Sequence, residues 1–444
     1  MAYMSSDKIV SELIPLLSKY ISTEEDEVLL AISENLSKFK VYLKDDKFTS
    51  VFPLYQTLLC AEETVVRETA IESIREVILN LSDDIIYNSI LPIIFNISNQ
   101  ENFTGKISAC YMIRMVYQKS SKDKEKLRSL YFKLCDEDVP LIKKAAAKEF
   151  GMLCTVMEKE FVNPDMINYF KKLMNESDSI RVILLSSLIY LVKLFHNTDL
   201  QRINVQVVVA ASDDKSWRVR HELAKIFPLL IEGFGNQQIN ELIPTFANLL
   251  KDSENEVKIA ALEGLETVIN GISQEKVGMS ILPAILTLNN ESSAYVKSLI
   301  GQSLGSIAKS VGYSVFSSKL LSAYEQLIKD ENPEVRLGAA KSLYDIISSG
   351  DQSNLNSNIQ LITNFQKDSR YKIREKMIIT LCSLGISYGI EIFKSTLEGL
   401  FFSYLTDPVY TVRERGVLCL EVRLKYKNIS NLMKNLGRVG RQII

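Results

Sequence analysis

The sequence contains few of the residues that interrupt regular structure. Its 444 residues include only 10 prolines and 18 glycines, spread thinly along the chain. No stretch rich in proline, glycine or serine divides it, so nothing in the composition marks a flexible linker between domains. Long segments with apolar periodicity alternate with short polar turns, and no convincing strand pattern occurs. The sequence therefore predicts an all-α fold.

An excess of charge of one sign is also absent. The chain has 52 Lys and Arg residues against 54 Asp and Glu residues, a net charge of −2, which gives no electrostatic basis for binding nucleic acid or a membrane surface. No apolar run is long enough to span a bilayer, and the first residues do not resemble a signal peptide. The six cysteines form no CxxC pair and predict reduced, mostly buried thiols. We therefore expect a cytoplasmic protein, with the nucleus as an alternative location.

Residues that carry catalytic chemistry are scarce. The two histidines, His196 and His221, lie in different parts of the chain. No phosphate-binding loop, HExxH motif or GxSxG elbow occurs. Because function must be argued from a site and none is visible, the sequence predicts no enzyme activity, no metal, no cofactor and no small-molecule substrate.

What the sequence does contain is a repeat. Basic residues, most of them preceded by an aliphatic residue, recur every 37 to 39 residues, and Leu29 takes the basic position in the first unit. We call these the anchor residues. They are Leu29, Arg67, Lys106, Lys143, Arg181, Arg220, Lys258, Lys297, Arg336, Arg374 and Arg413. This spacing predicts about eleven repeated units.

Each unit reads as a helical hairpin. After most anchors, apolar residues follow in steps of 4, 4 and 3, as in Val219, Leu223, Phe227 and Leu230. These steps place all four side chains on one face of a second helix, and another apolar segment before the anchor supplies a first helix. One hairpin cannot bury its apolar faces alone, so neighbouring hairpins must stack into a superhelical α-solenoid.

An acidic residue lies six positions before the anchor in most units. The acids are Glu137, Asp214, Asp252, Glu291, Asp330, Asp368 and Asp407. Their repetition predicts a ladder of ion pairs and hydrogen bonds between adjacent units, in which Asp330 and Arg336 are partners. Ala61, Gln100 and Asn175 occupy the acidic position in three units, so the ladder should be interrupted there.

The only tryptophan, Trp217, stands in a polar stretch three residues before its anchor. Asp178, Asn255 and Ala294 occupy the equivalent position in other units, so stacking does not require an apolar residue there. We therefore expect Trp217 to be exposed beside Arg218 and to anchor a protein interface. The alternative is that it packs over the neighbouring turn.

Several segments, in one order and spacing, resemble the scaffold (A) subunit of protein phosphatase 2A, a HEAT-repeat family. They include "AEETVVRETAIESI" (61–74), "DVPLIKKAAAKEF" (138–150), "DKSWRVRHELAKIF" (214–227) and "ENPEVRLGAAKSL" (331–343). The resemblance extends from about residue 10 to about residue 415. It implies a HEAT-repeat solenoid whose intra-repeat turns bind two partners, a regulatory (B-type) subunit and a catalytic subunit.

The resemblance also implies particular contact residues. Ser216, Trp217, Arg218 and Pro140 match the family's regulatory-subunit contacts, whereas Lys144 stands where the family usually has arginine. The residues at the start of the family's catalytic-subunit surface are Tyr371, Arg374, Tyr410 and Arg413.

Two departures from the family leave an alternative open. Family members usually have fifteen repeats, and this chain has about eleven. The last frame, Val412, Gly416, Leu420 and Arg423, places a glycine and an arginine on the buried face. We expect a HEAT array over residues 1–425 and an atypical basic segment over 426–444. The chain is then either a phosphatase scaffold or a HEAT adaptor that binds regulatory subunits without the catalytic subunit.

Overall fold

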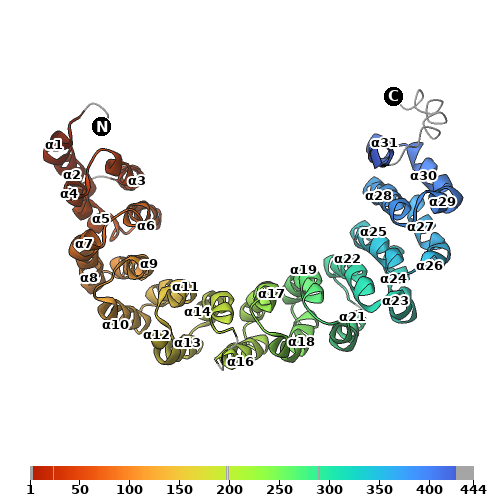
Figure 1. Ribbon diagram of the computed structural model, residues 1–444, viewed down its shortest axis with the longest axis horizontal. Coiled ribbons are helices and arrows are strands. Elements are labelled where there is room, and N and C mark those ends of the chain that lie inside the picture. Colours follow the sequence, from red (N-terminus) through yellow and green to blue (C-terminus); the bar gives the residue numbers. More distant parts are fainter. Residues whose placement is uncertain (1–3, 24, 197, 199, 289–290, 427–444) are drawn as a thin grey trace. The chain divides into compact units, whose positions relative to one another are not determined.

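The computed structural model of the chain describes residues 4–23, 25–196, 198, 200–288 and 291–426. All regular structure within these ranges is helical, and no strand occurs in them. The chain divides into two compact units, residues 1–204 and 205–444, with the division inside helix α16 (Gln201–Ser212). In both units, pairs of antiparallel helices follow one another at the predicted period (Figure 1).

The first unit contains five hairpins. Their second helices are α3 (Asp26–Asn35), α6 (Thr64–Ile78), α9 (Phe103–Lys119), α11 (Pro140–Val156) and the broken pair α14 (Asp178–Leu185) and α15 (Leu188–Leu194). Their first helices are built from α1 (Ser6–Lys8), η1 (Ile9–Leu13) and α2 (Ile14–Thr23); α4 (Asp45–Phe48), η3 (Thr49–Val51) and α5 (Phe52–Leu58); α7 (Asp83–Ile85), η4 (Ile86–Ile90) and α8 (Leu91–Asn99); α10 (Lys124–Cys135); and α12 (Lys159–Phe161), η5 (Val162–Met166) and α13 (Ile167–Leu173). A short 3₁₀ turn, η2 (Ser37–Val41), follows α3.

The second unit contains the remaining hairpins. Their second helices are α17 (Trp217–Ile231), α19 (Asn255–Asn270), α22 (Ala294–Val311), α25 (Pro333–Ser348), α28 (Tyr371–Tyr388) and α31 (Tyr410–Tyr426). After α16, the first helices are α18 (Asn236–Leu250); α20 (Gln274–Lys276), η6 (Val277–Ile281) and α21 (Leu282–Thr287); α23 (Tyr313–Lys319) and α24 (Leu321–Ile328); α26 (Gln352–Ser357) and α27 (Ile359–Gln366); and α29 (Ile390–Ile392), η8 (Phe393–Leu397) and α30 (Glu398–Leu405). The predicted all-α solenoid of eleven hairpins is therefore confirmed.

Several first helices contain a wider π-helical turn beside a proline. The turn η1 lies two residues before Pro15, and η4 and η6 end two residues before Pro92 and Pro283. Proline has no N–H to donate, and its ring crowds the carbonyl four residues earlier. A π turn relieves this crowding locally, so the helix continues through the proline instead of ending.

The second helices bury the face that the apolar steps predict. Val219, Leu223, Phe227 and Leu230 of α17 are each at most 2% exposed. The same frame in α31 contains Gly416, and the packing explains this glycine. A Cβ atom on Gly416 would lie 2.5 Å from both Ile378 Cδ1 of α28 and Leu405 Cδ2 of α30, so glycine lets α31 approach its neighbours closely.

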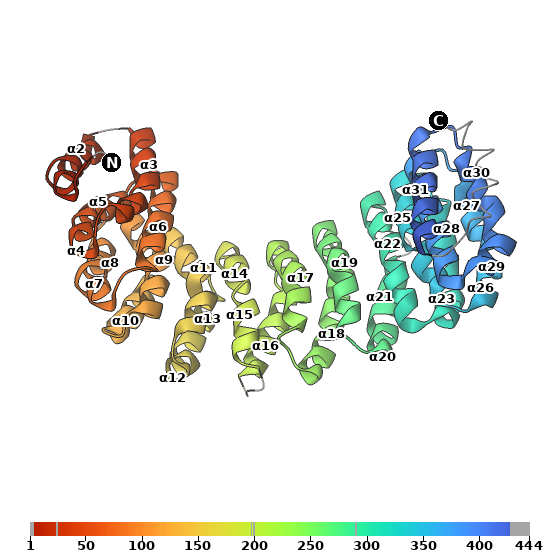
Figure 2. The ribbon, with the colours of Figure 1, turned by 45° about the horizontal axis from the view of Figure 1, so that its top comes forward.

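The second helices of successive hairpins pack directly on one another within each unit, as α19, α22 and α25 do (Figure 2). The turns inside the hairpins therefore line up along one edge of the stack. We call this edge, made of the intra-hairpin turns and the first turn of each second helix, the turn ridge. Of the predicted basic segment 426–444, Tyr426 ends α31, and residues 427–444 lie outside the described residues.

Candidate protein-binding ridge

The turn ridge is held together by arginines that each join two successive turns. Arg220 donates from Nε to Asp252 Oδ2 at 2.6 Å and from Nη2 to Asp252 Oδ1 at 3.0 Å, across to the next hairpin. Its remaining nitrogen, Nη1, donates to the main-chain carbonyl of Asp214 in its own turn at 2.6 Å. The guanidinium fork fits both tasks because its donors lie in one rigid plane.

The same arrangement recurs along the second unit. Arg336 pairs with Asp368, and Arg374 pairs with Asp407, each through Nε and Nη2, while Nη1 contacts main-chain carbonyls of the arginine's own turn. Where the anchor is lysine, the pair has a single contact. The lysine pairs are Lys106–Glu137 and Lys143–Glu176 in the first unit, and Lys258–Glu291 and Lys297–Asp330 in the second.

The predicted ladder between adjacent units is thus present, but the partner predicted for Asp330 was wrong. The Asp330 carboxylate pairs with Lys297 of the preceding hairpin at 3.0 Å, whereas Arg336 contacts only the Asp330 main-chain carbonyl, at 2.8 Å. The side chain of the acid points back along the stack because its Oδ1 also accepts the Asn332 N–H within the turn. The ladder therefore links anchors to acids 31 to 33 residues further on.

Two of the predicted interruptions can be compared with the structure. At Asn175 the prediction was wrong, because the next residue, Glu176, reaches Lys143 Nζ at 2.6 Å and replaces the missing acid. At Gln100 the interruption is confirmed. Arg67 donates to the carbonyls of Ala61 and Glu62 and to Thr64 Oγ1, and no carboxylate pairs with it within the described residues.

Burial and hydrogen bonding act against each other on the acids of the ladder. Burial by itself would raise the pKa of the Asp252 carboxyl, but the hydrogen bonds from Arg220 and from the Glu254 N–H outweigh it and lower that pKa. The same balance lowers the pKa of Asp407, whose carboxylate accepts from Arg374 and from the Val409 N–H. These acids are therefore held as carboxylates that fix the shape of each turn.

Trp217 lies on the exposed side of this ridge and is the first residue of α17. Ser216 caps the helix, and the Ser216 N–H is held by Asp214 Oδ1 at 2.8 Å. The indole is 37% exposed, its edge meets His221, and the Arg218 guanidinium lies 5.3 Å from the ring centroid. An apolar plane beside a cation thus faces outward from a turn that the ladder keeps rigid.

In the first unit the predicted residues are joined by neighbours that sequence reasoning missed. Pro140 is exposed at the first position of α11, and Lys144 is half-buried one turn later. Phe103 and Leu141 stand exposed on the same ridge. The signal was an apolar residue two or three positions before the anchor, where no buried contact requires one.

The residues predicted for the catalytic subunit fall into two groups. Tyr371 and Tyr410 are exposed, with Tyr410 61% accessible. Arg374 is buried, and its Nε, Nη1 and Nη2 all donate within the protein, which places it in the ladder beneath the surface. Arg413 is half-buried and donates from Nη1 to the carbonyls of Asp407 and Pro408.

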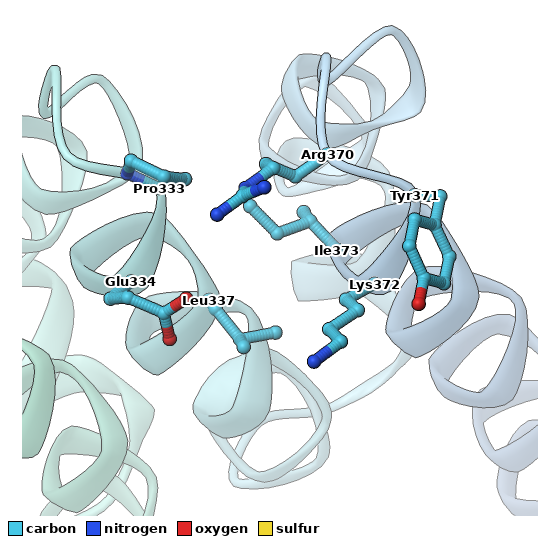
Figure 3. Close-up of a pocket in the computed structure, with 7 residues that line it drawn as sticks. All are labelled: Pro333, Glu334, Leu337, Arg370, Tyr371, Lys372 and Ile373. Atoms are coloured by element: carbon cyan, nitrogen blue, oxygen red, sulfur yellow. The ribbon is translucent and has the colours of Figure 1, made fainter.

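A small hollow lies on this part of the ridge, between the first turns of α25 and α28 (Figure 3). Its volume is about 70 Å³. Arg370 and Lys372 extend from α28 toward it, Leu337 and Ile373 supply apolar walls, and Tyr371 stands at its far side from α25. The hollow is lined by Pro333, Glu334, Leu337, Arg370, Tyr371, Lys372 and Ile373. Two cations beside an apolar wall suit a protein surface that carries acidic and apolar side chains.

The described helices include none that is both long enough and apolar enough to cross a membrane. Four of the six cysteines, Cys110, Cys135, Cys154 and Cys382, are buried, and all six are free thiols. The prediction of reduced, mostly buried cysteines is therefore confirmed.

Comparison with known proteins agrees with this architecture. Residues 16–280 match the family described as PIK3R4-like, middle domain, and residues 320–350 match the HEAT repeat. The chain aligns over 98% of its length with a crystal structure of the karyopherin Kap121p, at a TM-score of 0.65 and 14% identity, and covers 49% of that chain. At this identity the likeness shows the fold alone.

Curated relatives narrow the similarity further. The chain is 29% identical over 259 residues to the PP2A regulatory protein of type A from Saccharomyces cerevisiae, a match that covers 54% of this chain and 40% of the relative. It is 30% identical over 341 residues to the beta isoform of the human 65 kDa regulatory (A) subunit of serine/threonine-protein phosphatase 2A, which covers 75% of this chain and 57% of the relative. The matched region thus spans about half the length of these relatives. The chain belongs to the family of the PIK3R4-like middle domain, and it is a HEAT-repeat protein of the protein phosphatase 2A scaffold (A) subunit type.

Proposed function

We propose that this chain is a non-catalytic scaffold whose turn ridge binds the regulatory (B-type) and catalytic subunits of a protein phosphatase 2A-type phosphatase. The observation that carries the proposal is the exposed pair of Trp217 and Arg218 on a turn fixed by the ladder. A flat apolar side chain beside a cation, held rigid from below, is the kind of group that dominates protein interfaces. The relatives, which are named as regulatory (A) subunits of the phosphatase, support the identity of the partners.

The two units divide this task in the proposal. Pro140, Lys144, Ser216, Trp217 and Arg218 contact the regulatory subunit. Tyr371 and Tyr410 contact the catalytic subunit, and Arg374 acts beneath them by fixing the turn that leads to the next hairpin. The protein works in the cytoplasm, with the nucleus as a second location.

A second candidate function is an adaptor or competitor that binds regulatory subunits without the catalytic subunit. The observation that favours it is the number of hairpins, since eleven are present and the family usually has fifteen. Co-purification with each phosphatase subunit separates the two functions. A scaffold retains both subunits, whereas a competitor retains the regulatory subunit only.

Replacing Trp217 by alanine tests the ridge directly. We expect the affinity for the regulatory subunit to fall about thirtyfold, the effect of losing an interface anchor worth about 2 kcal/mol. The melting temperature should stay unchanged, because the ring is partly exposed and lies outside the buried frame of α17. Titration calorimetry and thermal melts measure the two quantities.

Leu229→Ala is the matched control for this variant. Leu229 lies on the same helix, is 49% exposed and stands away from the ridge, so its loss should change neither affinity nor melting. A marked drop in the melting temperature of Trp217→Ala would show that the indole belongs to the packing. Unchanged melting together with unchanged affinity would show that the regulatory subunit does not bind at this turn.

A further inference from the structure

The ladder leaves one arginine edge unoccupied. In Arg220, Arg336 and Arg374 the Nε–Nη2 edge holds a carboxylate of the following hairpin. In Arg413 the Nη1 atom makes its usual contacts within the turn, at 2.7 Å to the Asp407 carbonyl and 3.1 Å to the Pro408 carbonyl. No carboxylate pairs with its Nε–Nη2 edge in the part of the chain that the structure describes.

A second position on α31 is uncovered as well. Four residues after the anchor, the earlier hairpins of the second unit carry a residue that is buried against the next hairpin. Ala224, Leu262, Ala340 and Ile378 are each at most 4% exposed, and Gly301 is buried. At the equivalent position of α31, Val417 is 38% exposed.

Contacts between α28 and α31 show that this position faces the following hairpin. Ile378 Cδ1 lies 2.5 Å from the point where Gly416 would carry a Cβ atom. Likewise, a Cβ atom on Gly301 would lie 2.8 Å from the backbone nitrogen of Ala339. Arg413 and Val417 therefore form the stacking face of α31, and we call these two residues the end face.

The chemistry of the end face can be read from the earlier hairpins. The element that fits it is a helical turn that begins with an aspartate or glutamate, whose two oxygens take the Nε–Nη2 edge. An apolar side chain of the same element covers Val417 and excludes water from the ion pair, which strengthens it. A free phosphate would satisfy the arginine edge but would leave the apolar residue exposed, so the pair of features favours a protein.

We propose that the end face of α31 docks an acidic helical turn of the catalytic subunit, in the manner in which Arg374 takes Asp407. This proposal rests on the proposed scaffold function for the identity of the partner. It goes beyond that function because it places a contact on the stacking face as well as on the turn ridge, and it assigns a carboxylate as the group that Arg413 recognises.

The test measures the affinity of the purified phosphatase catalytic subunit for the 444-residue protein and its variants. Arg413→Glu should weaken binding by about thirtyfold, because it places a like charge against the partner's carboxylate. Arg413→Lys should give a smaller loss, because lysine makes one contact where arginine makes two. Val417→Asp should weaken binding while leaving the Arg413 contacts within its own turn intact.

Arg415→Glu is the matched control. Arg415 lies on the same helix and pairs with Glu375, away from the end face, so its reversal should change the affinity less than about threefold. Thermal melts of all variants check that α31 remains folded, and light scattering of the protein alone reports self-association.

The outcomes separate the two proposals. If the unaltered protein does not bind the catalytic subunit, the catalytic half of the proposed function is wrong, and this partner with it. If it binds and Arg413→Glu and Val417→Asp bind equally well, the end-face proposal is overturned and the scaffold function stands. Self-association that Arg413→Glu abolishes would identify a second copy of the chain as the occupant and would also overturn the proposal.

Discussion

Replacing Arg336 by alanine should destabilise the junction between two hairpins of the second unit. The change removes two hydrogen bonds to Asp368, at 2.6 and 3.1 Å, and two to the carbonyls of Asp330 and Glu331. The side chains of Arg336 and Asp368 are only 15% and 6% exposed, so the carboxylate would be left buried with the Arg370 N–H as its remaining donor. Breaking such a pair costs about 3 kcal/mol.

A double-mutant cycle distinguishes the two possible partners of Arg336. Arg336→Ala combined with Asp368→Ala should show a coupling of about 2 kcal/mol, because each single change removes the same pair. Arg336→Ala combined with Asp330→Ala should show less than about 0.5 kcal/mol, because the Asp330 carboxylate pairs with Lys297 instead.

Amide hydrogen exchange of α25 and α28 is the suitable assay for this cycle. A repeat array need not unfold in one step, so a local measurement of opening is preferable to one global midpoint. Arg336→Lys serves as the conservative variant, and we expect it to lose less than the alanine variant. A coupling to Asp330 as large as that to Asp368 would refute the assignment of ladder partners.

Two further predictions concern the stack as a whole. The pKa values of Asp252 and Asp407 are lowered in the folded state, so their stabilising effect is present above the usual aspartate range, near about 3.9, and is lost as the pH falls through their lower folded-state values. Urea midpoints should therefore be level near neutral pH and fall steeply below about pH 4; a midpoint that rises on acidification would contradict this sign. Gly338→Ala would place a Cβ atom 2.2 Å from the Ser298 carbonyl oxygen and should cost about 1–3 kcal/mol, whereas Gly399→Ala, with no atom within 4 Å, should cost nothing in the same thermal melts.

The sequence predicts the architecture well because the architecture is periodic. An anchor residue recurring every 37 to 39 positions fixes the number of hairpins, and apolar steps of 4, 4 and 3 fix the buried face of each second helix. Such regularities survive large changes in individual residues, since each hairpin packs only on its neighbours.

Which side chains pair in the ladder could not be predicted from spacing alone. An acid six positions before an anchor lies near that anchor and also near the anchor of the preceding hairpin. The main-chain hydrogen bond from Asn332 to Asp330 orients the carboxylate toward Lys297, and this depends on the three-dimensional turn. The substitution of Glu176 for the missing acid at Asn175 has the same origin, because the turn tolerates a shift of one residue.

Exposure on the ridge was predicted only in part. The variable residues at the position of Trp217 in other hairpins indicate correctly that stacking does not require this ring. The burial of Arg374 could not be seen in the same way, because an arginine at an anchor can face solvent or the next turn, and only the packing of α28 against the following hairpin decides between them.

The measurement that tests the scaffold proposal most directly is a titration of the purified chain with the regulatory and catalytic subunits of a phosphatase 2A-type enzyme, separately and together. The proposal predicts that both subunits bind, that they bind at the same time, and that Trp217→Ala weakens binding of the regulatory subunit about thirtyfold while leaving binding of the catalytic subunit unaffected. Failure of both subunits to bind the folded chain would contradict it.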